Sequence, residues 1–267
     1  MPRIKANDIE LYYETHGAGK PLVLISGIGY TLWQWHRMVP YLAEHFQVIT
    51  FDNRGVGQSD KPAGPYTAQT LAADTAGLLD ALGIEKAVVM GHSMGGFVAQ
   101  ALALDVPERV EKLILCSTNF GGPRHVPVTP EAMKVLTDVS SDPLTRFKNG
   151  IAVSTAPGWA ARNPEIIQEW VEWRAANPIE PSSYQAQLAI GLGLLPETAA
   201  FEGQLHRLNV PTLILFGVHD RAVPPANAAL LAEKIADSIV VILPDAGHFF
   251  PIEIPEAASH AVIEFAG

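Results

Sequence analysis

The sequence predicts an α/β fold: a mostly parallel sheet of eight strands with helices on both faces and an inserted helical cap. Short apolar runs alternate with segments of helical spacing, as in parallel strands joined by crossover helices. The pattern Gly-x-Ser-x-Gly at 91–95 stands between one such run and one such helix. The chain has 267 residues, of which 48% are apolar and 17% charged, so it can bury a large core.

The strands and helices follow a regular order outside the middle of the chain. Residues 3–16 alternate around Asn7-Asp8 and predict an antiparallel hairpin. Continuous apolar runs predict buried strands at 21–27, 46–52, 110–116, 210–217 and 239–243, and another in the first part of 86–104. Helical spacing predicts helices at 33–45, 67–82 and 225–235, in the second part of 86–104, and from about 255 onward. Thr67 is the expected N-cap of the second helix, and Gly83 ends it.

The middle of the chain breaks this alternation. Residues 119–209 contain helical segments such as 163–176 and proline-bounded turns, but no apolar strand comparable to the others. Because strands resume afterwards, we expect residues 1–118 and 210–267 to form one core, and 119–209 to be a cap inserted into it.

The overall composition narrows the class of protein. A net charge of −10 and a pI near 5.3 disfavour nucleic acid or an anionic membrane as a partner. Cys116 is the single cysteine and lies in an apolar run, which indicates a buried structural thiol. No signal-like or membrane-spanning run is evident, and no motif predicts a metal or cofactor. We therefore expect a cytoplasmic protein without cofactor that acts on a small molecule, and the oligomeric state stays open.

Ser93 occupies the centre of the Gly-x-Ser-x-Gly pattern. Gly91 and Gly95 flank it at the two positions where a side chain would collide as the backbone folds back, and Gly96 extends that clearance. The expected geometry raises one hydroxyl out of the sheet and points the amides of the following helix at developing charge. The pattern therefore predicts a nucleophile.

A serine nucleophile needs a general base and a carboxylate that orients the base. His248 follows the last predicted strand and Asp220 follows the strand before it, so both are expected in loops at the ends of strands. Among the competing residues, we expect His92 to support or pack and His219 to face outward. Asp245, three residues before His248, is the alternative acid.

Four short motifs together make the chain resemble the α/β-hydrolase superfamily over nearly its whole length. They are Gly91-His-Ser-Met-Gly95, Phe51-Asp-Asn-Arg-Gly55 with Gly57-Gln-Ser-Asp60, Gly217-Val-His-Asp220, and Gly247-His248 followed by Glu253 and Pro255. The resemblance implies Ser93 as nucleophile, Asp220 as acid and His248 as base, with a cap that shapes the substrate pocket.

The oxyanion hole and the substrate pocket are expected around the same serine. The backbone amide of Met94 is one expected donor, and that of Ile28 is the choice for the second. Many family members carry His-Gly where this chain has Ser26-Gly27. The candidate pocket residues are aromatic: Tyr30, Trp33, Phe120, Trp159 and Phe249. For the tryptophans of the 159–173 region we expect packing within the cap, and Trp159 is the one that could also contact a ligand. For the cap arginines 124, 146, 162 and 174 we expect surface solvation, with binding of an acidic substrate group as the alternative.

The leading functional hypothesis is a serine hydrolase that cleaves a small carboxylic ester or lactone through an acyl-enzyme. The family that the chain resembles includes carboxylesterases, enol-lactonases, C–C bond hydrolases and cofactor-free perhydrolases. C–C cleavage and perhydrolysis with the same triad therefore stay open. A protein of this fold that binds a ligand with negligible turnover is the alternative from another class.

Overall fold

The computed structural model describes residues 2–136, 138, 140 and 142–267 and contains one eight-stranded sheet. Its strand order is β1-β2-β4-β3-β5-β6-β7-β8. The strands are β1 (Arg3–Ala6), β2 (Ile9–His16), β3 (Lys20–Ile25), β4 (Phe46–Phe51), β5 (Ala87–His92), β6 (Val110–Cys116), β7 (Thr212–Gly217) and β8 (Ser238–Leu243). β2 pairs antiparallel with β1 and β4, and the strands from β4 to β8 in the sheet run parallel. The predicted fold class is confirmed.

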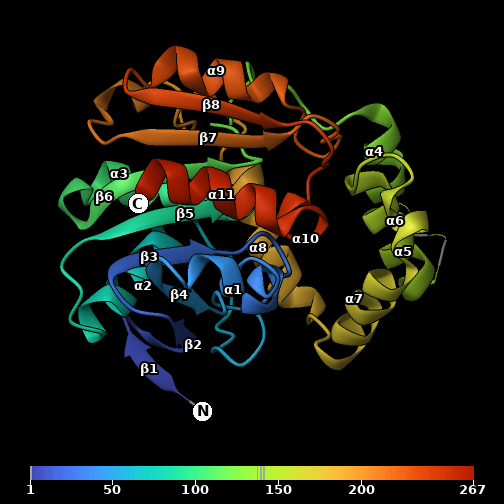
Figure 1. The fold of residues 1–267 in the computed structure, drawn as a ribbon, viewed down its shortest axis with the longest axis horizontal. Coiled ribbons are helices and arrows are strands. Elements are labelled where there is room, and N and C mark those ends of the chain that lie inside the picture. Colours follow the sequence, from blue (N-terminus) through green and yellow to red (C-terminus); the bar gives the residue numbers. More distant parts are fainter. Residues whose placement is uncertain (1, 137, 139, 141) are drawn as a thin grey trace.

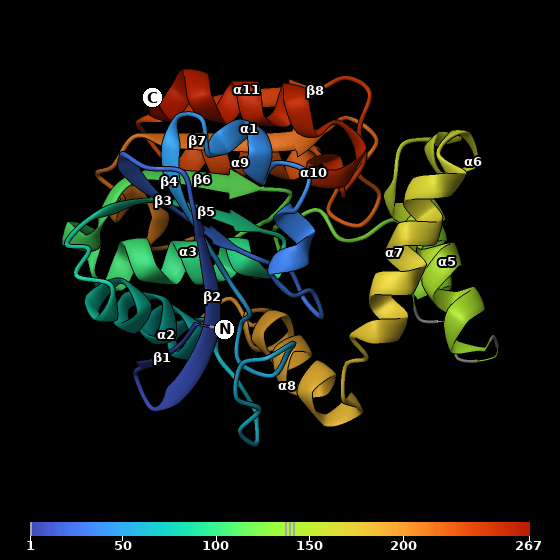
Figure 2. The same ribbon diagram turned by 60° about the horizontal axis from the view of Figure 1, so that its bottom comes forward.

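Helices cover both faces of the sheet, as Figures 1 and 2 show. One face packs against α2 (Ala68–Ala81), α3 (Met94–Asp105) and α9 (Ala226–Lys234), and the other against α1 (Val39–Leu42) and α11 (Pro255–Ala266). The short helices η2 (Pro107–Arg109), η3 (Leu205–Arg207) and α10 (Phe250–Glu253) lie in the connections. Thr67 caps α2 as expected, since its hydroxyl accepts from the Thr70 amide at 3.1 Å.

The helix predicted over 33–45 is wrong in its extent. The structure has a 3₁₀ turn, η1 (Leu32–Trp35), and then the single turn of α1. Pro40 has no amide hydrogen to donate and fits only the first turn of a helix, so the chain starts a new turn at Val39 instead of continuing one helix.

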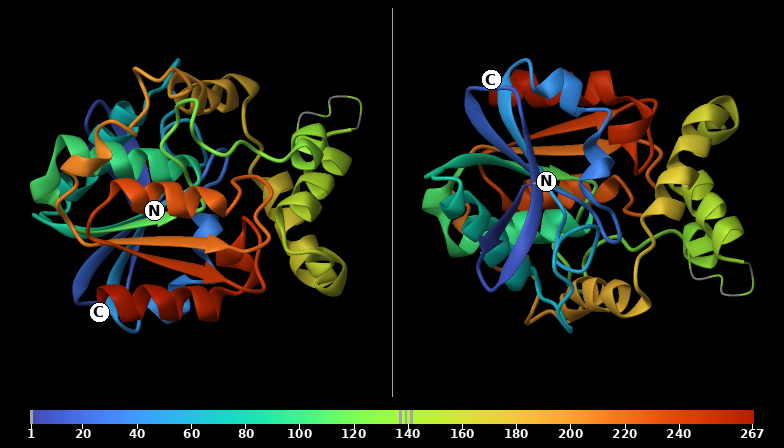
Figure 3. Two further views of the ribbon diagram at one scale, coloured as in Figure 1. Left: turned by 90° about the horizontal axis from the view of Figure 1, so that it is seen from above. Right: turned by 90° about the horizontal axis from the view of Figure 1, so that it is seen from below.

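Five α-helices lie between β6 and β7 within the described part of the chain. They are α4 (Pro130–Leu136), α5 (Pro143–Ser154), α6 (Trp159–Arg162), α7 (Pro164–Ala176) and α8 (Pro181–Gly193). Figures 2 and 3 show α4–α7, in green to yellow, as a group beside the sheet, whereas α8 lies against the core near α3. The insertion boundaries at 119 and 209 stay a prediction, but these helices lie between them.

Cys116 is fully buried at the end of β6, and burial raises the pKa of its thiol well above the ordinary value. No helix of the described residues has both the length and the apolar character needed to cross a membrane.

Candidate active site

Ser93 lies in a strained turn between β5 and α3. Its backbone has φ 55° and ψ −117°, a combination that non-glycine residues rarely adopt. A β-carbon at Gly91 would overlap the Gly95 carbonyl, and one at Gly95 would overlap the Ile25 carbonyl of β3. The two glycines therefore allow the close contact of strand, turn and helix that fixes the position of the serine.

Asp220 and His248 meet in the loops after β7 and β8. Asp220 Oδ2 lies 2.8 Å from His248 Nδ1, and the two side chains are almost completely buried. The other carboxylate oxygen, Oδ1, accepts from the amides of Ala222 at 2.9 Å and Val223 at 2.7 Å. The carboxylate is thus fixed on both sides and can hold the imidazole with Nδ1 protonated, which leaves Nε2 as a proton acceptor.

His92 links the strand of the serine to the loop of the histidine. Its Nε2 lies 2.7 Å from the carbonyl oxygen of His248, and the two imidazole rings are 4.6 Å apart. Burial keeps the pKa of His92 well below its ordinary value, so the ring is neutral and donates from Nε2. His92 therefore supports the loop of His248. Among the described residues, no hydrogen bond joins Ser93 to His248.

Glu253 supports the same loop through its carboxylate. In the sequence it stands out only as part of a motif. Its carboxylate accepts from the Gly247 amide at 3.0 Å and from the Ala156 amide at 2.7 Å. Burial raises the pKa of Glu253 to about 7. The His248 amide donates to the Ser154 carbonyl at 2.7 Å, so the histidine loop is bonded directly to the end of α5 and, through Glu253, to Ala156 just after it. A glutamate within the apolar stretch 249–254 was the available signal.

The two expected oxyanion donors have amides that are free to bind. Met94 is the first residue of α3, where amides have no partner within the helix. Ile28 lies between two amides that are occupied: Gly27 N donates to Gln34 Oε1 at 2.9 Å, and Gly29 N to Gln187 Oε1 at 2.8 Å. In the described chain the Ile28 amide has no hydrogen-bond partner.

An aromatic cluster joins the candidate site to the inserted helices. Four of the five expected pocket residues belong to it or pack against it, together with two tryptophans of α7: Tyr30, Trp33, Trp159, Phe249, Trp170 and Trp173. Tyr30 stacks on Trp173 with ring centroids 5.3 Å apart and lies 5.2 Å from the Phe249 ring. Phe120 is not part of this cluster, because it is buried in the core on the α3 face of the sheet.

The competing histidine and aspartate lie outside the site, and the cap arginines differ from one another in their surroundings. His219 and Asp245 are exposed. Of the cap arginines, Arg124 pairs with Glu202 at 2.8 Å, and Arg162 donates to the Pro157 carbonyl at 3.3 Å. Arg174 is half-buried and reaches the site, and the side chain of Arg146 falls outside the described part of the structure.

Metal ligands do not gather anywhere in the described chain: no group of three or more His, Cys, Asp or Glu is placed to hold an ion. The absence of a cofactor stays a prediction.

Comparison with known proteins agrees with this architecture. The model of the alpha/beta hydrolase fold family matches residues 20–255. The 3-oxoadipate enol-lactonase 2 of Acinetobacter baylyi is 30% identical over 97% of this chain and 94% of its own length. The pimeloyl-(acyl-carrier protein) methyl ester esterase of Pectobacterium carotovorum is 33% identical over 96% of this chain and 98% of its own. The structure of a thermophilic esterase from Thermogutta terrifontis matches with a TM-score of 0.79 and 32% identity, covering 98% of this chain and 96% of that one.

Proposed function

This chain belongs to the alpha/beta hydrolase fold family and is a hydrolase, and we propose that it cleaves small carboxylic esters or lactones through Ser93, His248 and Asp220. The observation that carries the proposal is the buried His248–Asp220 hydrogen bond at 2.8 Å. The backbone of His248 is also bonded to His92, the residue before the strained Ser93. Relatives named as an enol-lactonase and a methyl ester esterase support the substrate class.

In the proposed reaction, His248 Nε2 takes the proton of Ser93 as Oγ attacks the substrate carbonyl carbon. The carbonyl π bond breaks, and its electron pair becomes the oxyanion, which the amides of Ile28 and Met94 stabilise. The tetrahedral intermediate collapses, and the protonated His248 gives its proton to the leaving alkoxide. In a lactone the leaving oxygen stays attached to the acyl group.

The second half repeats these steps with water. His248 takes a proton from the water as it attacks the acyl-enzyme, and the proton returns to Ser93 when the acid leaves. Asp220 keeps the imidazole oriented and stabilises its positive charge throughout. In this mechanism the Ser93–His248 hydrogen bond forms when substrate binds, since catalytic hydrogen bonds are often completed only in the complex with substrate.

The aromatic cluster supports an apolar substrate group. Two of its rings lie close in sequence to candidate catalytic residues: Tyr30 is two residues after Ile28, and Phe249 is one residue after His248. We propose that the acyl or alcohol part of the substrate lies against these rings, where burial of apolar surface favours binding.

Replacement of Ser93 by alanine tests the proposal. With p-nitrophenyl butyrate, S93A should lower kcat by three orders of magnitude or more, roughly the scale of triad loss. The matched control is S259A in α11, which also removes a buried hydroxyl. Among the described residues, Ser259 Oγ has no hydrogen-bond partner. S259A should keep wild-type kcat. A fluorophosphonate should label the wild type and S259A but not S93A.

Full activity in S93A would overturn the assignment. Stoichiometric labelling of Ser93 without turnover of any ester or lactone would instead identify a ligand-binding protein. A panel that contains a p-nitrophenyl ester, an enol lactone, a vinylogous diketone, and acetate with hydrogen peroxide separates the ester and lactone reactions from C–C cleavage and perhydrolysis.

A further inference from the structure

The four-residue turn at 27–30 contains the Ile28 amide and lies next to Ser93. A β-carbon at Gly27 would be 3.4 Å from Cβ of Ser93, so the turn and the serine are in direct contact. The Tyr30 amide donates to the Gly27 carbonyl at 3.3 Å, and Gly29 has φ 72°. These are features of a type II turn, in which the third residue needs a positive φ.

Each of the three peptide groups of this turn has its own hydrogen bond. In the first peptide group, between Gly27 and Ile28, the Gly27 carbonyl accepts a hydrogen bond from the Tyr30 amide. Because the carbonyl and the amide hydrogen of a trans peptide point in opposite directions, this bond also fixes the direction of the Ile28 N–H. The second peptide is held at Gly29 N by Gln187, and the third at Gly29 O by Arg174, at 2.8 and 2.9 Å.

Two of these three bonds come from the inserted helices. Gln187 belongs to α8 and is fully buried, and both ends of its amide are used. Oε1 accepts from Gly29, and Nε2 donates to the Arg54 carbonyl at 2.9 Å. One cap side chain therefore connects the turn after β3 with the loop after β4.

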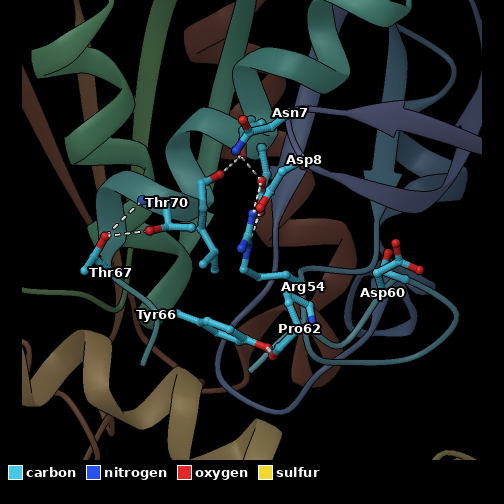
Figure 4. A network of polar contacts seen from close by, with 12 residues as sticks. Asn7, Asp8, Arg54, Asp60, Pro62, Tyr66, Thr67 and Thr70 are labelled. Atoms are coloured by element: carbon cyan, nitrogen blue, oxygen red, sulfur yellow. Dashed lines mark hydrogen bonds and ion pairs between the residues drawn. The ribbon is translucent and has the colours of Figure 1, made fainter. Parts of the chain in front are cut away.

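The loop that anchors Gln187 is itself fixed. The Arg54 guanidinium bonds Asp74 of α2 at 2.5 Å and Asp8 at 2.8 Å, and Figure 4 shows Arg54 directed at Asp8 and its neighbour Asn7. Arg54 and Asp74 are both buried. The carbonyl that receives Gln187 is thus attached to a rigid part of the core.

Arg174 has a comparable setting on α7. Its guanidinium carbon lies 4.6 Å from the Trp173 ring centroid, 5.3 Å from Tyr30 and 5.2 Å from Phe147. Stacking on three rings restricts the guanidinium to a few orientations, and in this one Nη2 donates to the Gly29 carbonyl.

We propose that Gln187 and Arg174 are positioning residues of the oxyanion hole: they hold the turn so that the Ile28 amide points at the oxyanion. This inference rests on the hydrolase mechanism proposed above. Neither side chain has to touch the substrate, since each acts through the backbone of Gly29. The inserted helices thereby contribute to the rate of the chemical step as well as to the shape of the pocket.

A positioning role predicts a loss in kcat with little change in KM. An interaction used in the transition state lowers kcat when it is removed, whereas lost ground-state binding raises KM. Removal of an entire oxyanion donor costs about 10²- to 10³-fold in kcat. A donor that is present but no longer held should cost less, on the order of 10- to 100-fold.

The principal test is Gln187→Met, which keeps the side-chain length and removes both hydrogen bonds. Its matched control is Q185M, at an exposed glutamine of the same helix. Q187M should lower kcat for p-nitrophenyl butyrate by about 10- to 100-fold with KM within about twofold. A trifluoromethyl ketone, whose adduct with Ser93 places an oxyanion in the hole, should bind Q187M more weakly by a similar factor. Butyrate, the product, should bind equally well, and Q185M should match the wild type in all three measurements.

Arg174→Met is the second variant, because a half-buried position tolerates substitution if Q187M does not fold. It should lower kcat by roughly 10-fold at unchanged KM, and R174K, which keeps a donor, should recover part of the loss. A raised KM with unchanged kcat in R174M would make Arg174 a substrate-binding residue and overturn its positioning role. Wild-type kcat and inhibitor affinity in Q187M would overturn that of Gln187.

The outcome of S93A separates the two proposals. If the wild type hydrolyses the ester and S93A does not, the hydrolase mechanism stands, and an unaffected Q187M contradicts only the positioning role. If S93A retains activity, the proposed function fails before Gln187 is considered.

Discussion

The loops at the carboxyl ends of the sheet strands and the helices between β6 and β7 contribute to the candidate site in different ways. The loops supply the groups proposed to react: Ser93 after β5, Asp220 after β7 and His248 after β8. The inserted helices supply partners for the loop backbones instead, through Ser154 at the His248 amide and Gln187 at the Gly29 amide.

The insertion therefore contributes hydrogen bonds to the loops of the candidate site. It is bonded to the site on two sides, at the histidine loop and at the turn after β3. A movement of these helices would therefore change the positions of the proposed base, His248, and of one proposed oxyanion donor, Ile28, together. Substitutions in each region can measure how far the chemistry depends on it.

Asp220→Asn tests the core loops and should have the largest effect. The asparagine carbonyl can still accept the Ala222 and Val223 amides that bind Oδ1, so the loop should keep its fold. The side-chain NH₂ would then face His248 Nδ1 and favour the wrong tautomer, for which a loss in kcat of about 10⁴-fold is expected. Steady-state ester hydrolysis measures it.

The control for Asp220 is D245N, at the exposed aspartate three residues before His248. It should leave kcat unchanged. If D245N instead loses activity while D220N retains it, Asp245 is the acid of the triad and our assignment of Asp220 is wrong.

Glu253→Gln tests the contact between the two regions, because Glu253 binds Ala156 of the insertion and Gly247 of the core. The pKa of Glu253 is raised from 4.5 to about 7, so the folded protein favours the protonated carboxyl. Its stabilising contribution is complete below pH 4.5 and is lost as the pH rises through about 7. At 1.36 kcal/mol per pKa unit, the effect on the free energy of unfolding is at most about 3 kcal/mol.

Denaturant unfolding between pH 4 and 8 should therefore show the wild type losing stability relative to E253Q as the pH rises. Asp220 and His248, which act electrostatically on Glu253, are present in both proteins, so the comparison isolates the effect of Glu253 itself. E256Q, at an exposed glutamate of α11, should show no such change relative to the wild type. A stability difference independent of pH would contradict the raised pKa.

The sequence predicted the strand-end loops well because their signals are local. The turn at Ser93 and the loops that contain Asp220 and His248 each follow an apolar strand within a few residues, and the carboxyl ends of parallel strands meet at one edge of a sheet. The resemblance to a known family then assigned the roles, which stay predictions.

The supporting contacts could not be predicted in the same way. Gln187 bonds Gly29 and Arg54, which are 158 and 133 residues away along the chain, and nothing in the pattern of α8 marks that residue. Phe120 illustrates the same difficulty from the other side. It is an aromatic residue just after β6, as a pocket residue could be, and it packs into the core. Helix packing decides both, and spacing along the sequence does not encode it.

Gly29→Ala should have the smallest effect and isolates the turn from the side chains that hold it. A β-carbon at Gly29 would meet only the side chains of Ile179 and Tyr184 at 3.6 Å, so the substitution fits and its cost comes from the φ of 72°. That cost is about 1–2 kcal/mol, by which the turn would be biased away from its type II form. Gly83 is the matched control, since it has φ 68° at the end of α2 and no atom of the described residues lies within 4 Å of an added β-carbon. G29A and G83A should lose similar free energy of unfolding, but only G29A should lower kcat, by several-fold at unchanged KM. Equal kcat in the two variants would mean that the conformation of this turn does not limit the reaction, and that the bonds from the inserted helices serve stability alone.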